Sequence, residues 1–180
     1  MKTAARLGIR RKMRTTGYCN DTGTREKRVI DVETMPMRLT PFHVALQVRD
    51  IDEARHFYKT VLGCPEGRSA AQWADFNLYG HQLVCHVNPA LGPRGQVTAH
   101  HNPVDAHSVS VPHCGVVLEM EDWTVLAQRL KDYGMKFVVE PYIRFAGLPG
   151  EQATLFLLDP SGNALEFKAF KNIAAQLFAT

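Results

Sequence analysis

The residues most able to do chemistry are two histidines and a glutamate, His43, His113 and Glu166. A neutral imidazole and an ionised carboxylate both offer lone pairs near neutral pH, so these residue types recur as metal ligands. Two imidazoles and one carboxylate leave coordination positions open, which suits Fe²⁺ and also serves Mn²⁺, Co²⁺, Ni²⁺ or Zn²⁺ with water. A lone histidine on a strand is more often a packed or surface residue. The metal hypothesis therefore requires the fold to bring the three together.

Matching positions in two similar segments favour that hypothesis. His43 lies in PFHVALQV and His113 lies in PHCGVVLEM, near the start of each segment. Both segments have the alternation of a half-buried strand. Pairing of two such halves about a pseudo-twofold axis would bring the two starts toward a shared centre.

Glu166 belongs to a strand that we predict over residues 164–170. Side chains alternate between the two faces of a strand, so Leu165 and Phe167 point one way and Glu166 points the other way. We expect the apolar face to meet the core, which directs Glu166 to the concave side of a sheet. A carboxylate buried there is costly unless it is paired or bound to a metal.

A repeated order of elements positions these residues. Asp50 or Asp52 can cap a helix that ends at Gly63, and a second helix closes near Gly134. Beyond the two histidine segments, strands are expected over residues 73–78, 81–87, 136–140, 153–158 and 164–170. The order is βαβββ twice, and a curved sheet of this size cannot bury its concave face alone. The prediction is an α+β fold of two paired βαβββ modules around a curved-sheet metal cleft.

Charge and composition divide the chain into a tail and one domain. Residues 1–40 carry ten Lys/Arg against four acidic residues, a net charge of +6, whereas residues 41–180 have a net charge of −3. A nucleic-acid-binding domain would concentrate positive charge on its folded part, so that class is disfavoured. We place the domain and its parts at residues 41–175, with modules 41–90 and 112–172 and a linker over 91–111.

The tail and the cysteines bear on location. The tail has the composition of a disordered extension, or of a translation start set upstream of Met35 or Met37, and an Arg-rich organellar presequence is the alternative. No apolar run reaches the ~18–20 residues that a membrane span needs. No CxxC pair occurs, so we expect free thiols, with Cys85 and Cys114 as packing residues. Free thiols are typical of a reducing compartment, so we expect a cytoplasmic protein unless the tail is a presequence.

Two segments resemble a known superfamily. PFHVALQVRDIDEARHFYKTVLGC is similar to the opening of the vicinal oxygen chelate superfamily, which contains glyoxalases, bleomycin resistance proteins and extradiol dioxygenases, and GEQATLFLLDPSGNALEF resembles its closing signature. The resemblance runs from about Pro41 to Phe170. It implies a divalent metal on His43, His113 and Glu166, with Fe²⁺ or Mn²⁺ preferred and Zn²⁺ or Ni²⁺ possible. It also implies a small-molecule substrate held through two neighbouring oxygens, and a homodimer in which halves are sometimes exchanged so that one site uses both subunits.

The resemblance leaves a fourth ligand open. Glyoxalase I-like members place a glutamate on the last strand of the first half. Aligning Gly80 with Gly162 puts Val84 opposite Glu166, where no ligand is possible. His86 lies two residues on and shares that face, so it becomes a ligand if the strand is shifted or bulged, and otherwise lines the pocket.

The remaining candidates surround the predicted metal. Extradiol dioxygenases carry a tyrosine where Phe156 stands, which weakens the likeness to that subgroup. A linker histidine, with His101 preferred over His100 and His107, is the candidate acid or base, and a solvated His-rich loop is the favoured alternative. Lys168 shares a strand face with Glu166 and could hold an anionic oxygen or neutralise the glutamate. Arg68 and Arg144 are candidates for holding an anionic substrate group, with an ordinary surface role as the alternative. Tyr142 is a further candidate for substrate binding, because it stands where the dioxygenases carry a histidine after the second helix.

Two classes of function remain. The favoured one is a metal-dependent enzyme on a small oxygen-rich molecule, with the dioxygenase-like triad ahead of a glyoxalase I-like lyase or isomerase. The other is a bleomycin-resistance-type binding protein that sequesters its ligand without a metal. A sequestering cleft has no use for His43, His113 and Glu166 together, which is why the enzyme is preferred.

Overall fold

The computed structural model describes residues 39–104, 107–148 and 150–178. The chain divides into a unit Met1–Thr40 and a compact unit Pro41–Thr180. The predicted basic tail, with the alternative starts at Met35 and Met37, lies outside the described residues except for Leu39 and Thr40. Among the described residues, no helix is both long and apolar enough to cross a membrane.

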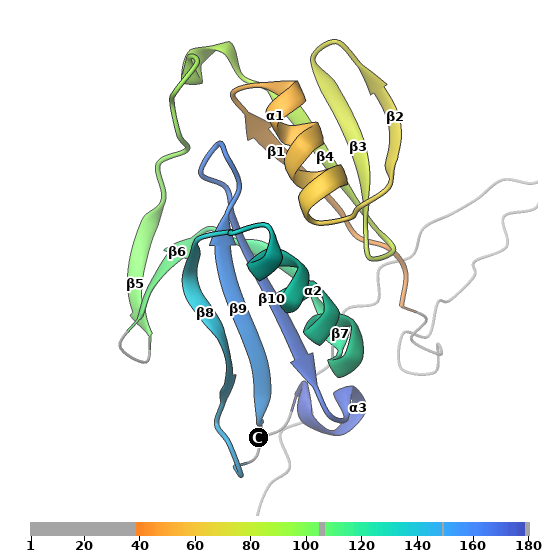
Figure 1. The fold of residues 1–180 in the computed structure, drawn as a ribbon, viewed down its shortest axis with the longest axis vertical. Helices are drawn as coiled ribbons and strands as arrows, with labels where there is room; N and C mark the ends of the chain where they lie inside the picture. Colours follow the sequence, from red (N-terminus) through yellow and green to blue (C-terminus); the bar gives the residue numbers. More distant parts are fainter. Residues whose placement is uncertain (1–38, 105–106, 149, 179–180) are drawn as a thin grey trace, which may run out of the picture. The chain divides into compact units, whose positions relative to one another are not determined.

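The first half is a four-stranded sheet with a helix (Figure 1). Its elements in chain order are β1 (His43–Val48), α1 (Ile51–Arg55), the π-helical η1 (His56–Val61), β2 (Glu66–Ala70), β3 (Trp73–Leu78) and β4 (His81–Val87). The strand order is β1-β4-β3-β2, and β1 runs parallel to β4. Asp50 caps α1, because its carboxylate accepts from the backbone N–H groups of Asp52 and Glu53 at 2.8 Å.

The second half repeats this plan. Its elements are β7 (Cys114–Glu119), α2 (Met120–Asp132), β8 (Phe137–Arg144), β9 (Gln152–Leu158) and β10 (Ala164–Phe170), followed by a short α3 (Ile173–Gln176). The order β7-β10-β9-β8 matches the first sheet, with β7 parallel to β10. The predicted α+β fold of two βαβββ modules is confirmed.

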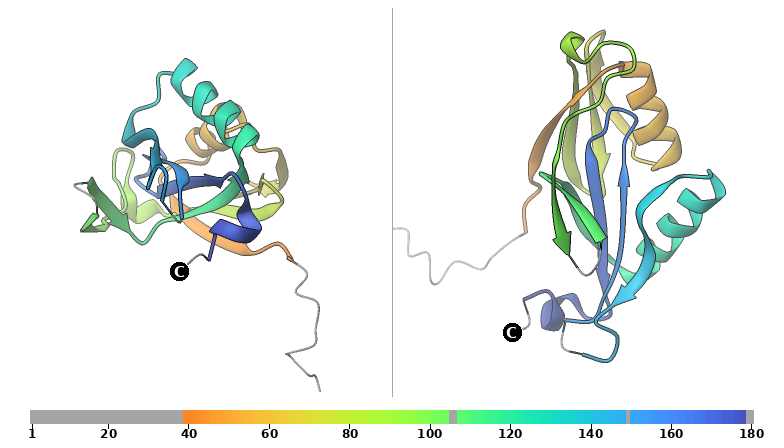
Figure 2. Two further views of the ribbon diagram at one scale, coloured as in Figure 1. Left: turned by 90° about the horizontal axis from the view of Figure 1, so that it is seen from below. Right: turned by 90° about the vertical axis from the view of Figure 1, so that its left-hand side faces the viewer.

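The two halves pack through their helical sides. Both helices lie on the same side of the strands (Figure 2). Phe57 and Tyr58 of η1 belong to the same buried core as Leu126 and Leu130 of α2. Arg129 of α2 also donates to backbone carbonyls at the end of η1, at 2.6 and 2.7 Å.

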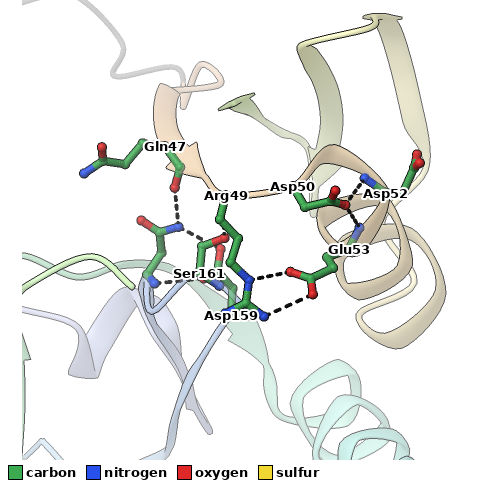
Figure 3. Close-up of polar contacts among 8 residues, drawn as sticks. Gln47, Arg49, Asp50, Asp52, Glu53, Asp159 and Ser161 are labelled. Carbon is green, nitrogen blue, oxygen red and sulfur yellow. Dashed lines mark hydrogen bonds and ion pairs between the residues drawn. The ribbon is translucent and has the colours of Figure 1, made fainter. Parts of the chain in front are cut away.

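The turn before β10 ties the halves together a second time. The Asn163 amide donates to the carbonyl of Gln47 at 2.8 Å, and the Ser161 hydroxyl accepts from the Arg49 backbone at 3.0 Å (Figure 3). Asp159 stabilises the turn by accepting from the backbone N–H groups of Ser161 and Asn163. The far end of β1 is therefore held against the second half.

The strand predicted over residues 136–140 extends to Arg144 in β8, and two further features were not predicted. Strand β2 was not located, because its burial pattern shows one half-buried residue and four exposed ones and so carries no alternation. The predicted linker 91–111 contains a hairpin of β5 (His100–Val104) and β6 (His107–Val111). Its Pro, His and Asn residues hid the strand pattern.

Candidate metal centre

His113 and Glu166 meet on the face of the second sheet that points away from the buried core. His113 directly precedes β7, whose Gly115 pairs with Glu166 of β10. The Nε2 atom of His113 lies 3.3 Å from Oε2 of Glu166. Leu165 and Phe167 point into the core, as the strand parity predicts.

A hydrogen bond to the backbone fixes the orientation of the His113 ring, with Nε2 toward Glu166. Nδ1 lies 2.8 Å from the carbonyl oxygen of Ser110, which can only accept, so Nδ1 carries the proton. In the neutral ring, Nε2 then presents a lone pair toward a carboxylate oxygen. Two such atoms repel unless a proton on Nε2 or a metal ion lies between them. Metal–ligand bonds of about 2.0–2.2 Å put neighbouring ligand atoms roughly 3.0–3.5 Å apart, so the observed 3.3 Å fits a divalent metal.

Glu166 has two further partners. The Thr154 hydroxyl donates to Oε1 at 2.9 Å, and the Lys168 ammonium lies 3.4 Å from Oε2. Thr154 orients the carboxylate, whereas Lys168 competes with a metal for the same oxygen. Both readings of Lys168 from the sequence, an anion-binding group and a neutralising partner, fit this position.

A cavity of about 370 Å³ opens beside the pair, with Phe42, Gly115 and Lys168 in its lining. Gly115 is required there, because a Cβ atom would lie 1.6 Å from the carbonyl oxygen of Glu166. Phe156 lies behind His113, with ring centroids 5.2 Å apart in an edge contact. The pair thus has an apolar wall and an open side.

His43 belongs to a different half-site, on the first sheet. Its neighbour Phe42 lines the cavity beside His113, and successive side chains on a strand point to opposite faces. The His43 ring contacts Gln82 of β4, with Nδ1 and Oε1 2.8 Å apart. Gln82 lines a second cavity, of about 400 Å³, on this sheet.

The three predicted ligands are therefore not assembled in one chain. Within residues 39–104, 107–148 and 150–178, no group of three His, Cys, Asp or Glu side chains is placed to hold a metal. Among these residues the two strand starts do not bring the three side chains together within one chain. The reason is the packing described above, which joins the halves by their helices and leaves the strand faces of His43 and Glu166 unpaired with each other.

The comparisons with known proteins agree with this fold. A family model of the glyoxalase/bleomycin resistance protein/dioxygenase superfamily matches residues 40–167. The chain belongs to this superfamily. A relative named Glyoxylase I 4 from Arabidopsis thaliana is 28% identical over 138 residues, which are 73% of this chain and 71% of that protein.

Two solved structures illustrate the likeness. A glyoxalase/bleomycin resistance protein/dioxygenase from Alicyclobacillus acidocaldarius is 32% identical, with a TM-score of 0.59 over 75% of this chain and 94% of that one. The fosfomycin resistance protein FosX from Listeria monocytogenes is 17% identical, with a TM-score of 0.54 over 79% of this chain and 99% of that one. The second likeness is one of fold alone.

The sheet register argues against His86 as a fourth ligand in this superfamily member. His43 pairs with Gln82, and His86 pairs with Gln47, four residues further along both strands. At about 3.3 Å per residue the separation is roughly 13 Å, too far for one metal ion. Val84, the position aligned with Glu166, is buried and cannot ligate. The first half thus offers His43 alone.

Three other predicted site residues have contacts of their own in the second half of the chain. His101 of the hairpin lies 3.5 Å from the Ser110 hydroxyl, next to the carbonyl that orients His113. Tyr142 of β8 packs against the small buried cluster of Val139, Phe156 and Ala164, and the Arg144 guanidinium lies over the ring of Phe145.

The cysteines behave as packing residues. Cys85 is fully buried, and burial raises the pKa of its thiol well above the usual range. Burial raises the pKa of Cys114 to about 11. Neither sulfur is a thiolate near neutral pH, so neither is a ready metal ligand.

Sequence reasoning missed the residues that orient the candidate ligands. They are Asp75, Gln82, Ser110 and Thr154. Gln82 could have been found, because the βαβββ plan makes the first and last strands of a module parallel neighbours and so places a residue of β4 beside His43. The Ser110 contact runs through a backbone carbonyl and leaves no signal in residue type.

Proposed function

We propose that this protein is a metal-dependent enzyme acting on a small oxygen-rich molecule, with each metal held by His113 and Glu166 of one copy and His43 of a second copy. The observation that carries the proposal is the 3.3 Å approach of His113 Nε2 to the Glu166 carboxylate, with Nδ1 of the same ring held by the Ser110 carbonyl. A protein that only sequesters a ligand gains nothing from such an arrangement.

The shared centre rests on the way the halves pack. Each sheet carries an incomplete half-site beside its own cavity, one with His43 and one with the His113–Glu166 pair. Phe42 and Val117 line the cavity of about 370 Å³ beside the His113–Glu166 pair, and both remain more than a third exposed. A second copy that presents its first sheet to this cavity would cover these side chains and supply the third ligand, so the active form is a homodimer in which each site uses residues of both copies.

The chain's own residues would divide the work as follows. His43, His113 and Glu166 hold the metal, which when bound supplies a Lewis acid and a template for two neighbouring oxygens. The Lys168 ammonium binds an anionic substrate oxygen beside Glu166. Phe42 and Phe156 exclude water from the site. His101 is the candidate acid or base.

A dioxygenase-like reaction is the first candidate because the buried Val84 stands where a fourth protein ligand would be needed. The open positions of a bare triad accept a substrate and O₂. A glyoxalase I-like lyase or isomerase is the second candidate, favoured by the name of the 28% identical Arabidopsis relative.

Metal analysis of protein purified without chelator tests the proposal. The matched proteins are the wild type, a His43→Ala/His113→Ala/Glu166→Ala variant, and His56→Ala as a control for an exposed helical histidine. We expect stoichiometric metal in the wild type and the control, and none in the triple variant. Fe or Mn would favour the dioxygenase, and Ni or Zn the lyase or isomerase. Negligible metal in all three would contradict the enzyme.

A further inference from the structure

A chain of three hydrogen-bonding side chains leads away from His43 across the first sheet. His43 Nδ1 lies 2.8 Å from Gln82 Oε1, and the Gln82 amide nitrogen donates to Asp75 Oδ2 at 3.0 Å. The Asp75 carboxylate also faces the Arg68 guanidinium at 3.4 Å. Asp75 is buried, whereas Arg68 is largely exposed.

The donors and acceptors in this series of hydrogen bonds determine the tautomer of His43. A carboxylate only accepts hydrogen bonds, so the amide nitrogen of Gln82 must point toward Asp75. The amide oxygen then faces His43, and since it also only accepts, the proton of the neutral ring resides on Nδ1. The lone pair is left on Nε2.

The second half reaches the same result by another route. His113 also has its Nδ1 against an acceptor, the carbonyl of Ser110. Both histidines therefore present Nε2 as the nitrogen with the lone pair. Acceptors behind a ligating imidazole fix its tautomer and ring orientation.

We infer that Gln82 and Asp75 are positioning residues, which hold His43 in the Nδ1–H tautomer so that Nε2 serves as the metal ligand. This inference rests on the proposed metal function. Arg68 closes the outer end of the chain, but a long contact on an exposed side chain contributes little. The two inner residues carry the effect.

The first test measures the tautomer of His43 in the full, metal-free chain by long-range ¹H–¹⁵N NMR, at a pH where the ring is neutral. The His43→Gln variant assigns the signals. We expect the Nδ1–H tautomer in the wild type and a mixture of tautomers in Asp75→Asn, since an asparagine can donate or accept and frees the Gln82 amide to turn over. A wild type without the Nδ1–H tautomer would overturn the inference.

An exchange of the two groups provides the rescue. In Asp75→Asn/Gln82→Glu, the carboxylate at position 82 accepts from both His43 and the new amide, so the Nδ1–H tautomer should return. Gln82→Leu removes the acceptor and should not be rescued by Asp75→Asn. Gln47→Leu, on the same face of β1 and bonded to Asn88 instead, is the matched control and should leave the tautomer unchanged. If His43 remained a mixture of tautomers in Asp75→Asn/Gln82→Glu, the positioning role of Gln82 and Asp75 would be contradicted.

The second readout is Zn²⁺ affinity, measured by chelator competition. We expect Gln82→Leu and Asp75→Asn to weaken binding by about 10–100-fold, with recovery in the double variant and no loss in Gln47→Leu. If the wild type binds no Zn²⁺ while the tautomer shifts as described, the proposed function fails and the positioning role stands. If the wild type binds Zn²⁺ but neither variant alters tautomer or affinity, the positioning role fails alone.

Discussion

The two βαβββ halves share one topology and differ in what they place on the concave face. In the second half, Glu166 of β10 lies beside Gly115 of β7 and faces His113. At the matching pair of the first half, Val84 of β4 lies beside Ala45 of β1. One half thus supplies two ligand groups and the other supplies His43 alone.

The difference extends to how each histidine is held. His113 depends on a backbone carbonyl, which no substitution of the side chain at position 110 removes. His43 depends on the side chains of Gln82 and Asp75, which can be changed singly. The two halves therefore share their strand positions but orient their histidines through different partners, a side chain in one half and a backbone carbonyl in the other.

The largest expected effect comes from Glu166, whose matching position in the first half is occupied by Val84. Glu166→Gln removes the charge and the anionic ligand while keeping the side chain's shape, so Zn²⁺ affinity should fall by more than the ~100-fold that loss of an orienting partner costs. Chelator competition measures it, with Glu151→Gln, whose carboxylate pairs with Lys171, as the control. Unchanged affinity in Glu166→Gln would remove Glu166 from the centre.

The first half can also be given a carboxylate at position 84, which matches Glu166 of the second half. Val84→Glu buries a charge beside Asp75 of the neighbouring strand, which should lower the free energy of unfolding of the metal-free protein by at least about 2 kcal/mol. A divalent metal should restore this stability, since the new carboxylate becomes a fourth ligand. Thermal unfolding with and without Zn²⁺ checks it. An equal metal-induced shift in the melting temperature of variant and wild type would show that position 84 does not face the centre.

A smaller effect is expected from the strand contact that distinguishes the halves. Gly115→Ala places a Cβ 1.6 Å from the Glu166 carbonyl oxygen, so β7 must shift away from β10, at a cost of about 1–3 kcal/mol in unfolding free energy. Denaturant unfolding measures the loss. Ala45→Gly, at the matching position, should cost only about 0.5–1 kcal/mol. Equal losses would mean that the two strand pairs pack alike.

The smallest effects separate the two partners of Glu166. Thr154→Val removes a donor that orients the carboxylate and should weaken Zn²⁺ binding by about 10-fold. Lys168→Met removes a competing cation and should strengthen it modestly. Titration of both variants under the same conditions checks the opposite signs. Weaker binding in Lys168→Met would show that the lysine supports the metal site rather than competing with it.

Much of each half was predictable because local patterns determined it. Strands β3, β4 and β10 have the predicted bounds, since each shows a clear apolar face or a turn signal such as Tyr79-Gly80, where both residues have positive φ. The alternation along β10 correctly placed Glu166 opposite to Leu165 and Phe167. Edge strand β2 and the β5–β6 hairpin carry no such pattern and were missed.

The arrangement of the halves was not predictable from periodicity. Alternation says which face of a strand is polar, but not whether the facing sheet belongs to the same chain. That choice depends on long-range contacts such as Asn163 with the Gln47 carbonyl and Arg129 with the end of η1. These contacts join residues more than 60 positions apart and have no local signature.

The central claim is that one metal ion is held by residues of two copies, and complementation tests it most directly. A chain with His43→Ala and a chain with His113→Ala/Glu166→Ala, carrying different tags, are co-expressed and the heterodimer is purified. In the heterodimer one centre combines His43 of the second chain with the intact pair of the first. We expect one metal ion per heterodimer and none in either homodimer. A heterodimer without metal, beside a wild type that binds it, would contradict a centre shared between copies.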